Sequence, residues 1–162
     1  MRLLLASSID GYLARDADDD MRWTGKTDKA VFRLLTMSNA NDVLLAGSTT
    51  FDQMPRLPNR SMVRITRALD AENLGLGISL GEAHLRHPDG WLIGGPTLAL
   101  AALRLGYVSR AFITIVPTEL GGGMHASELA QFLPNNGDTP VRIAVGDIEV
   151  RVFTEDMKWP GR

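Results

Sequence analysis

The stretch Met21-Arg-Trp-Thr-Gly-Lys-Thr-Asp-Lys-Ala-Val-Phe32 places one aspartate between two aromatic residues. Trp23 stands five residues before Asp28, and Phe32 stands four residues after it. Thr27 or Asp28 is a natural helix N-cap, so we expect a helix to begin here. If Asp28 lies in the first turn of that helix, its carboxylate shares one face with the ring of Phe32.

The predicted helix, over about residues 28–37, has further apolar side chains beside Phe32. Val31, Leu34 and Leu35 form this stripe, which we expect to face the core. A carboxylate and an aromatic ring would then lie together at the edge of a buried surface. This setting suits a flat, nitrogen-rich heterocycle, because the ring stacks on apolar surface while the carboxylate accepts two parallel N–H bonds. The structural alternative is that the carboxylate only caps the helix and the aromatic ring only fills the core.

The composition is that of an ordinary globular protein. The chain has 162 residues, of which 44% are apolar and 22% charged, so we expect one domain over residues 1–162. The net charge of −2 gives no reason to expect nucleic acid or an anionic membrane as a partner. The absence of cysteine excludes disulfides, a thiol nucleophile and thiolate metal sites. We expect no membrane span, a cytoplasmic location, a small-molecule substrate and a monomer or homodimer.

An acidic segment precedes the Trp-to-Phe stretch and resembles the start of a calcium loop. Asp16, Asp18 and Asp20 have the required spacing. However, Met21 occupies the sixth position, where glycine is needed, and Thr27 occupies the twelfth, where glutamate is needed. We therefore expect a solvated loop without calcium.

The three histidines are poor candidates for catalysis. His84 and His87 lie in a predicted polar surface helix, and His125 lies in a glycine-rich loop. The sequence therefore offers no convincing Ser–His–Asp triad and no histidine-based metal site. We expect no metal.

Apolar runs that alternate with helical patterns predict a mainly parallel α/β sheet. A helix is expected after Pro96 and Thr97, which are good start signals, and a weak helix over residues 81–87. Two alternating segments around Gly146-Asp147 predict an antiparallel hairpin at the sheet edge, over residues 141–145 and 148–153. The remaining strands are predicted over residues 2–7, 42–46, 61–66, 74–80, 90–93 and 109–117.

Several predicted strand ends carry residues that suit a dinucleotide. Ligands of parallel sheets collect at the carboxyl ends of the strands. Gly47 and the hydroxyl residues after it offer backbone N–H groups to an anion, and Gly94-Gly95 lets phosphates approach the backbone. No Rossmann fingerprint is present. Gly, Ser, Thr or Arg at four such ends predicts a dinucleotide site formed by residues 7–10, 47–50, 66–67 and 94–97.

Taken together, these residues resemble dihydrofolate reductase over roughly residues 1–117. The resemblance implies that family's fold, with a central mostly parallel sheet, helices on both faces and an antiparallel C-terminal hairpin. It also implies NADPH-dependent reduction of 7,8-dihydrofolate to tetrahydrofolate in one-carbon metabolism. The protein would then be a target for antifolates. The motifs that carry it are the Trp23–Asp28–Phe32 spacing, Gly47-Ser-Thr-Thr-Phe51, Leu57-Pro-Asn-Arg60, Thr66-Arg67, Ile93-Gly-Gly95 and Thr114.

The resemblance assigns roles to individual residues. Asp28 would hold the amino group and ring nitrogen of the pterin, helped by Thr114 through water. Phe32 would pack on the ring and Arg60 would grip the glutamate carboxylate, while residues 10–23 would close over the nicotinamide. The implied catalytic residues are Asp28, Trp23 and Thr114, and the implied substrate-binding residues are Ser7, Asp28, Phe32, Arg60 and Thr114. The implied NADPH-binding residues are Ala6, Ser7, Gly47, Ser48, Thr49, Thr50, Thr66, Arg67, Gly94, Gly95, Pro96 and Thr97.

The sequence departs from the family pattern at three places. The position after Gly47 is often basic and helps bind the cofactor's 2′-phosphate, but here it is Ser48, which leaves Arg67 as the main candidate. Pro96 stands in place of the family's third glycine, and Ala99 in place of a frequent aromatic residue.

Two other stretches resemble a sister family, the pyrimidine reductase domain of bacterial riboflavin biosynthesis. They are Ser8-Ile-Asp-Gly-Tyr-Leu-Ala14 and Val116-Pro-Thr-Glu-Leu-Gly-Gly-Gly-Met124. The alternative functions are therefore reduction of a ribosylamino-pyrimidine or of another dihydropterin, and, from another class, a nucleotide-binding protein without catalysis. Asp28 in its Trp-x4-Asp setting favours the folate branch.

Overall fold

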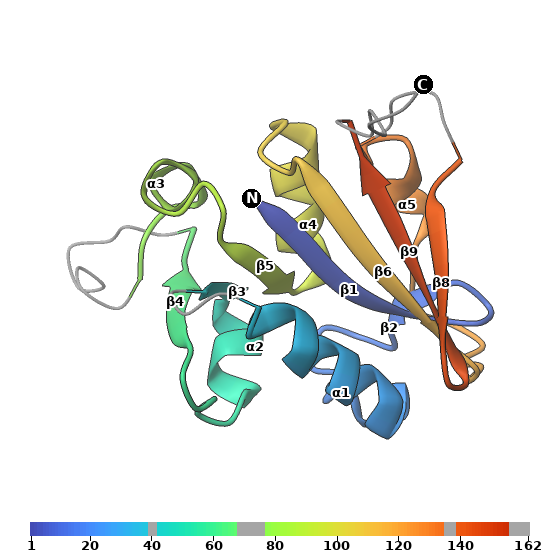
Figure 1. Cartoon of the computed structure of the whole chain (residues 1–162). Coiled ribbons are helices and arrows are strands. Elements are labelled where there is room, and N and C mark those ends of the chain that lie inside the picture. The colour runs from blue at the N-terminus through green and yellow to red at the C-terminus, as the bar shows by residue number, and fades with distance from the viewer. Residues whose placement is uncertain (39–41, 68–76, 135–138, 156–162) are drawn as a thin grey trace.

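The computed structural model describes residues 1–38, 42–67, 77–134 and 139–155. Seven strands form one sheet in the order β4-β3-β5-β1-β6-β9-β8 (Figure 1). Neighbours from β4 to β6 are parallel, and β9 and β8 add an antiparallel hairpin at the edge. The strands are β1 (Arg2–Ser8), β3 (Val43–Gly47), β4 (Ser61–Ile65), β5 (Trp91–Gly94), β6 (Arg110–Val116), β8 (Val141–Val145) and β9 (Ile148–Thr154). The predicted α/β architecture is confirmed.

Helices cover both faces of this sheet. On one face, apolar side chains of α3, α4 and α5 join a core that includes Leu3, Leu45 and Leu92. On the other face, α1 packs through Val31 and Leu35. The helices are α1 (Gly25–Thr36), α2 (Ser48–Gln53), α3 (Leu80–Arg86), α4 (Pro96–Arg104) and α5 (Ser127–Ala130), and a 3-10 turn, η1 (Arg22–Thr24), precedes α1. Among the described residues, no helix is both long and apolar enough to cross a bilayer.

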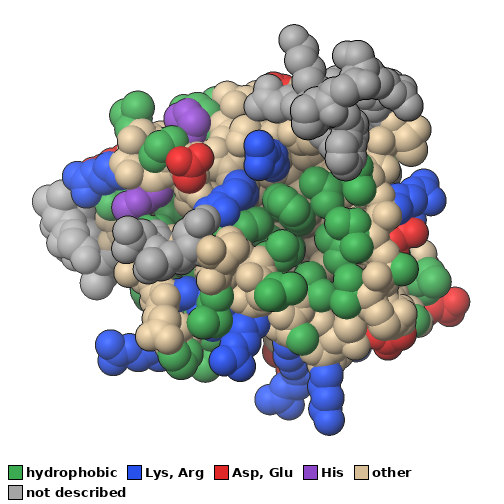
Figure 2. Space-filling view, in the orientation of Figure 1, with side chains coloured by type: hydrophobic (Ala, Val, Ile, Leu, Met, Phe, Trp, Pro, Cys, Tyr) green, Lys and Arg blue, Asp and Glu red, His purple; other side chains and the backbone are tan. Residues whose placement is uncertain are grey.

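Strand β1 is central because its sequence is apolar on both sides. Six of its seven residues are buried, as a strand sandwiched between two helical layers requires. It pairs with β5 on one side and with β6 on the other. Figure 2 shows hydrophobic side chains gathered over the part of the sheet that β1, β6 and β9 form. At the far edge β8 is more exposed, and Ile143 and Val145 are 47% and 36% exposed.

The structure corrects two local expectations. Helix α1 begins at Gly25 after an N-cap at Thr24, so neither Thr27 nor Asp28 is the cap. Leu34 is 74% exposed and does not face the core. It follows Phe32 by two residues, and at about 100° per residue it therefore projects about 160° away from that side chain.

The short elements differ most from the sequence prediction. Leu80 begins α3 and is not in a strand, while Ile78 forms only an isolated parallel bridge to Ile65. The rest of that predicted strand, residues 74–76, lies outside the described residues, and Gly77 is described but has no strand pairing. A second two-stranded sheet, β2 (Tyr12–Ala14) with β7 (Met124–His125), and helix α5 were not expected from sequence.

Candidate active site

A cleft of about 1320 Å³ opens at the carboxyl ends of β1, β3, β4 and β5. Chain order reverses there, since β5 returns to lie between β3 and β1. Such a switch point is where open α/β sheets bind ligands. The loop over residues 15–21 and helix α1 form the other walls. Of the residues predicted for the site, the cleft is lined by Ala6, Asp28, Phe32, Gly47, Ser48, Thr49, Thr50, Arg60, Thr66, Arg67, Gly94, Gly95, Pro96 and Thr97.

Asp28 presents a carboxylate to this cleft from the first turn of α1. Thr114, at the centre of β6, donates its hydroxyl proton to Asp28 Oδ1 at 2.5 Å. Thr114 is only 1% exposed and also lies 3.5 Å from the carbonyl oxygen of Leu5, a much longer contact. The buried hydroxyl therefore fixes one oxygen of a carboxylate that lines the cleft. The resemblance implied that Thr114 helps to hold a pterin through water, and the structure adds a direct hydrogen bond from Thr114 to Asp28.

Phe32 and Arg60 extend the wall beyond Asp28. Phe32 is one turn further along α1, and the guanidinium carbon of Arg60 lies 5.8 Å from the centre of its ring. Arg60 Nη1 donates to Thr36 Oγ1 at 2.8 Å, which attaches the loop before β4 to the end of α1. Burial, and then the neighbouring charge of Arg33, lower the pKa of Arg60, although an arginine remains protonated in water. This end of the cleft therefore carries clustered positive charge.

The opposite wall is made of backbone and small side chains. Gly94, at the end of β5, has a φ of 141°, a conformation that favours glycine. A Cβ at this position would lie 3.3 Å from Thr50 Oγ1. The end of β5 therefore packs closely on the start of α2 and exposes its backbone to the cleft.

Three predicted site residues lie behind the lining rather than in it. Thr114 acts on the cleft only through Asp28. Trp23 is 8% exposed and donates its ring N–H to the carboxylate of Asp19, at 3.0 and 3.2 Å. Ser7 is 1% exposed and donates its hydroxyl proton to the carbonyl oxygen of Ser8. The structure therefore brings Asp28, Phe32 and Arg60 together in the lining of the cleft, whereas Trp23 and Ser7 do not line it.

Asp19 organises the acidic loop, and the sequence analysis missed this role. Besides the Trp23 ring, its carboxylate accepts N–H groups from Arg15 at 2.6 Å and from Met21 at 2.8 Å. These bonds to Arg15, Met21 and Trp23 outweigh the effect of burial and lower the pKa of Asp19. On the far side of the cleft, Gln53 donates to the carbonyl oxygen of Asp18 at 3.1 Å. These bonds therefore run within the loop and across the cleft entrance. Among the described residues, no group of three or more His, Cys, Asp or Glu side chains could hold a metal ion.

Asp10 joins the two stretches that resemble the pyrimidine reductase domain. Its carboxylate accepts N–H groups of Leu120 at 3.1 Å and of Gly121 at 2.7 Å. A hydrogen bond with Ser8 and then these backbone N–H groups lower the pKa of Asp10 to about 2. The turn after β1 is thereby fixed to the loop after β6.

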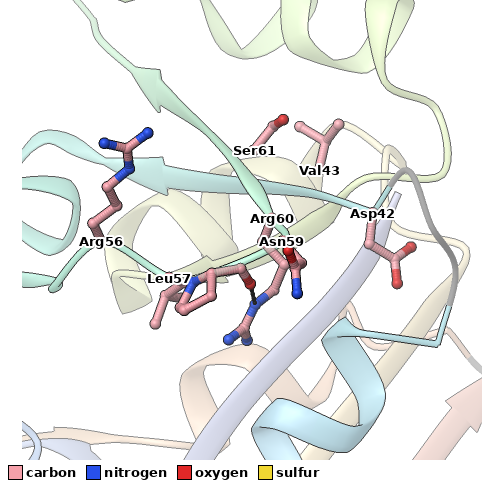
Figure 3. A pocket seen from close by; sticks show the side chains of 8 residues that line it. Asp42, Val43, Arg56, Leu57, Asn59, Arg60 and Ser61 are labelled. Atoms are coloured by element: carbon pink, nitrogen blue, oxygen red, sulfur yellow. Dashed lines mark hydrogen bonds between the residues drawn. The ribbon is translucent and has the colours of Figure 1, made fainter.

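A second, smaller cavity of about 630 Å³ lies beside the loop before β4 (Figure 3). It shares Leu57 and Arg60 with the main cleft. Asp42 lines it, but its carboxylate pairs with Arg2 at 2.8 Å. In Figure 3 the guanidinium groups of Arg56 and Arg60 point in different directions, so this cavity has no convergent set of charges.

The comparisons with known proteins place this geometry in a structural class. No family model matches the sequence, and no curated protein matches it. The structure is similar to that of dihydrofolate reductase from Enterococcus faecalis complexed with NADP(H) and RAB-propyl, with a TM-score of 0.64 over 93% of each chain. The fold is that of dihydrofolate reductase. The sequence identity is 15%, so this likeness shows the fold and leaves the chemistry to be argued from the cleft.

Proposed function

We propose that this protein is an NADPH-dependent reductase that converts 7,8-dihydrofolate to tetrahydrofolate. One observation carries the proposal: the carboxylate of Asp28, fixed by Thr114, lies beside the ring of Phe32 in the wall of the cleft. A carboxylate in this position accepts two parallel N–H bonds from a pterin's amino group and ring nitrogen. The pterin stacks on Phe32, and Arg60 binds a carboxylate of the substrate's tail.

The opposite wall fits a dinucleotide. The cleft continues from Asp28 past Gly94 to Ser48 and Arg67, so a long ligand can lie against both walls. Gly94 would not accept a Cβ without strain, which leaves room for a ligand to approach the backbone. When bound, NADPH supplies the hydride, and the chain's own residues orient the substrate and exclude water.

Protonation of the substrate requires a separate source. The described residues that line the cleft include no histidine, tyrosine or cysteine. Asp28 polarises the ring by binding its N–H groups and raises the basicity of the imine nitrogen. We propose that a water molecule delivers the proton.

Reduction of a ribosylamino-pyrimidine is the second candidate. The two stretches that resemble that family lie against each other, joined by the bonds from Leu120 and Gly121 to Asp10. Arg60 distinguishes the candidates, because a substrate without a glutamate tail does not need a carboxylate-binding arginine at this position. A non-catalytic nucleotide-binding protein would give Asp28 no ligand to bind.

The test is NADPH oxidation by the purified protein with three substrates in parallel: dihydrofolate, a ribosylamino-pyrimidine and a dihydropterin without a glutamate tail. NADH is run beside NADPH. Turnover of dihydrofolate that an antifolate blocks supports the proposal. Turnover of the pyrimidine alone assigns the second function, and NADPH binding without turnover of any of the three rejects both.

A further inference from the structure

Strand β8 leaves one edge of the main sheet open. It is the last strand in the sheet order, and no described strand pairs with its outer side (Figure 1). At the opposite edge, Ile78 covers part of β4 through its bridge to Ile65. Natural proteins blunt an open edge with proline, lysine or a β-bulge. The sequence Val141-Arg-Ile-Ala-Val145 has no proline or lysine, and its register with β9 runs without a shift.

One face of this edge strand is apolar. Val141, Ile143 and Val145 alternate along β8, so their side chains share a face of the sheet. In the register with β9, Ile143 lies beside Val150, which belongs to the core that α1 helps to form. Ile143 is nevertheless 47% exposed and Val145 36% exposed. The described residues therefore leave uncovered a row of side chains that continues a core.

The backbone of β8 points outward at two residues. A two-residue turn joins β8 to β9, so Val145 and Ile148 form a hydrogen-bonded pair. Hydrogen-bonded and non-hydrogen-bonded pairs alternate along an antiparallel ladder. The N–H and C=O groups of Arg142 and Ala144 therefore point away from β9, where another strand can pair with them.

The sequence of β8 is complementary to itself about Ile143. When two copies pair antiparallel around this residue, Ile143 lies opposite Ile143 of the second copy, and Arg142 lies opposite Ala144 of the second copy. The Arg142–Ala144 pairs are those whose backbone groups point outward, and each such pair exchanges two hydrogen bonds. The two Ile143 residues form a non-hydrogen-bonded pair, in which side chains approach most closely. On the same face, Val141 meets Val145 of the second copy.

The charges on the other face of β8 favour the same pairing. Arg142 lies directly opposite Arg151 of β9, and like charges placed opposite each other are unfavourable. Glu149 lies beside Ala144. In the paired copies, Arg142 of one copy therefore reaches over the small side chain of Ala144 toward Glu149 of the other. Glu149 contacts Arg151 through Oε1, so its Oε2 can accept from this second guanidinium.

We propose that β8 pairs antiparallel with β8 of a second copy of this chain, centred on Ile143, and so joins two sheets into one. The interface consists of a short strand and a row of valine and isoleucine side chains, which is at the small end of specific interfaces. We therefore expect a dimer with a Kd in the micromolar range. The proposal does not depend on the reaction, because β8, which is described in full, does not line the cleft.

The test is the mass of the full chain by analytical ultracentrifugation from about 1 to 100 μM, around the expected Kd. Ala144→Pro removes an N–H that β9 does not use, so it blocks the second copy and keeps the hairpin. Ile143→Lys places two like charges at the centre of the interface. Leu85→Lys is the matched control, because Leu85 is 82% exposed on α3. We expect Kd to rise by about tenfold or more in both β8 variants and to stay within about twofold in the control.

The register has a test of its own, because the chain contains no cysteine. Two cysteines in a non-hydrogen-bonded antiparallel pair lie at a separation that a disulfide accepts. Ile143→Cys should therefore form a disulfide-linked dimer under mild oxidation, seen on a denaturing gel without reductant. Leu85→Cys is the control and should remain a single chain on the same gel.

Two results would overturn the proposal. A wild type that stays monomeric up to about 100 μM would reject a second copy as the occupant and leave this edge to a different chain. A dimer of unchanged Kd in both Ala144→Pro and Ile143→Lys would place the contact between copies elsewhere. Circular dichroism checks that each variant is folded, and if Ala144→Pro does not fold, Ile143→Lys and Ile143→Cys provide the same comparison.

Discussion

Replacing Thr114 by valine isolates the contact that orients Asp28. Valine has nearly the same shape as threonine, so the substitution removes the hydroxyl without opening a cavity at a residue that is only 1% exposed. The lost bond is the 2.5 Å contact to Asp28 Oδ1. A hydrogen bond to a charged group contributes about 1.5–3 kcal/mol. We therefore expect kcat/KM for dihydrofolate to fall by roughly tenfold to 150-fold.

Two assays check this prediction for Thr114→Val. Steady-state NADPH oxidation gives kcat/KM, and the Kd of a diaminopyrimidine antifolate, which pairs with the same carboxylate, gives a binding measurement without turnover. Thr118→Val is the matched control, because the Thr118 hydroxyl donates to the carbonyl oxygen of Trp23 and does not line the cleft. If Thr114→Val changes both quantities by less than about twofold while remaining folded, Thr114 does not position Asp28.

Three further predictions concern other parts of the molecule. Arg60→Ala should lower kcat/KM for dihydrofolate by about tenfold or more, and should hardly change kcat/KM for a dihydropterin without a glutamate tail. An equal loss of kcat/KM for both substrates would show that Arg60 does not bind the tail. Gly94→Ala should destabilise the fold by about 1–3 kcal/mol because its φ is 141° and its Cβ would crowd Thr50; in thermal melts Gly95→Ala, with ordinary space around its Cβ, is the control. Asp10→Asn should lower the melting temperature at pH 7. Because folding lowers the pKa of Asp10 to about 2, the stabilisation is complete above the unfolded-state value near 4 and is lost as pH falls toward 2, so the two melting curves should converge there.

The sequence predicted the long elements because their patterns are local. The apolar run of β1 and the Pro96 start of α4 needed no knowledge of distant residues. The spacing of Asp28 and Phe32 also placed both side chains on one wall of the cleft. Short elements were missed, since β7 has two residues and α5 has four, too few to show a period.

The contacts that sequence could not show join distant positions. Thr114 meets Asp28 across 86 residues, and Arg64 meets Ser48 across 16. Such pairs depend on strand order and register, which no local propensity encodes. The local bond from Trp23 to Asp19 could have been found from sequence, because the two residues are only four apart in an otherwise acidic loop.

The most direct test of the account is dihydrofolate turnover by Asp28→Asn beside the wild type, with NADPH as the reductant. Asparagine keeps the shape of the side chain and removes its charge. Losing one partner of a buried charged pair costs about 3–5 kcal/mol. The account predicts that the wild type turns over dihydrofolate and that the variant, still folded by circular dichroism, loses activity by a factor of hundreds or more. Turnover by the variant within a fewfold of the wild type would contradict it.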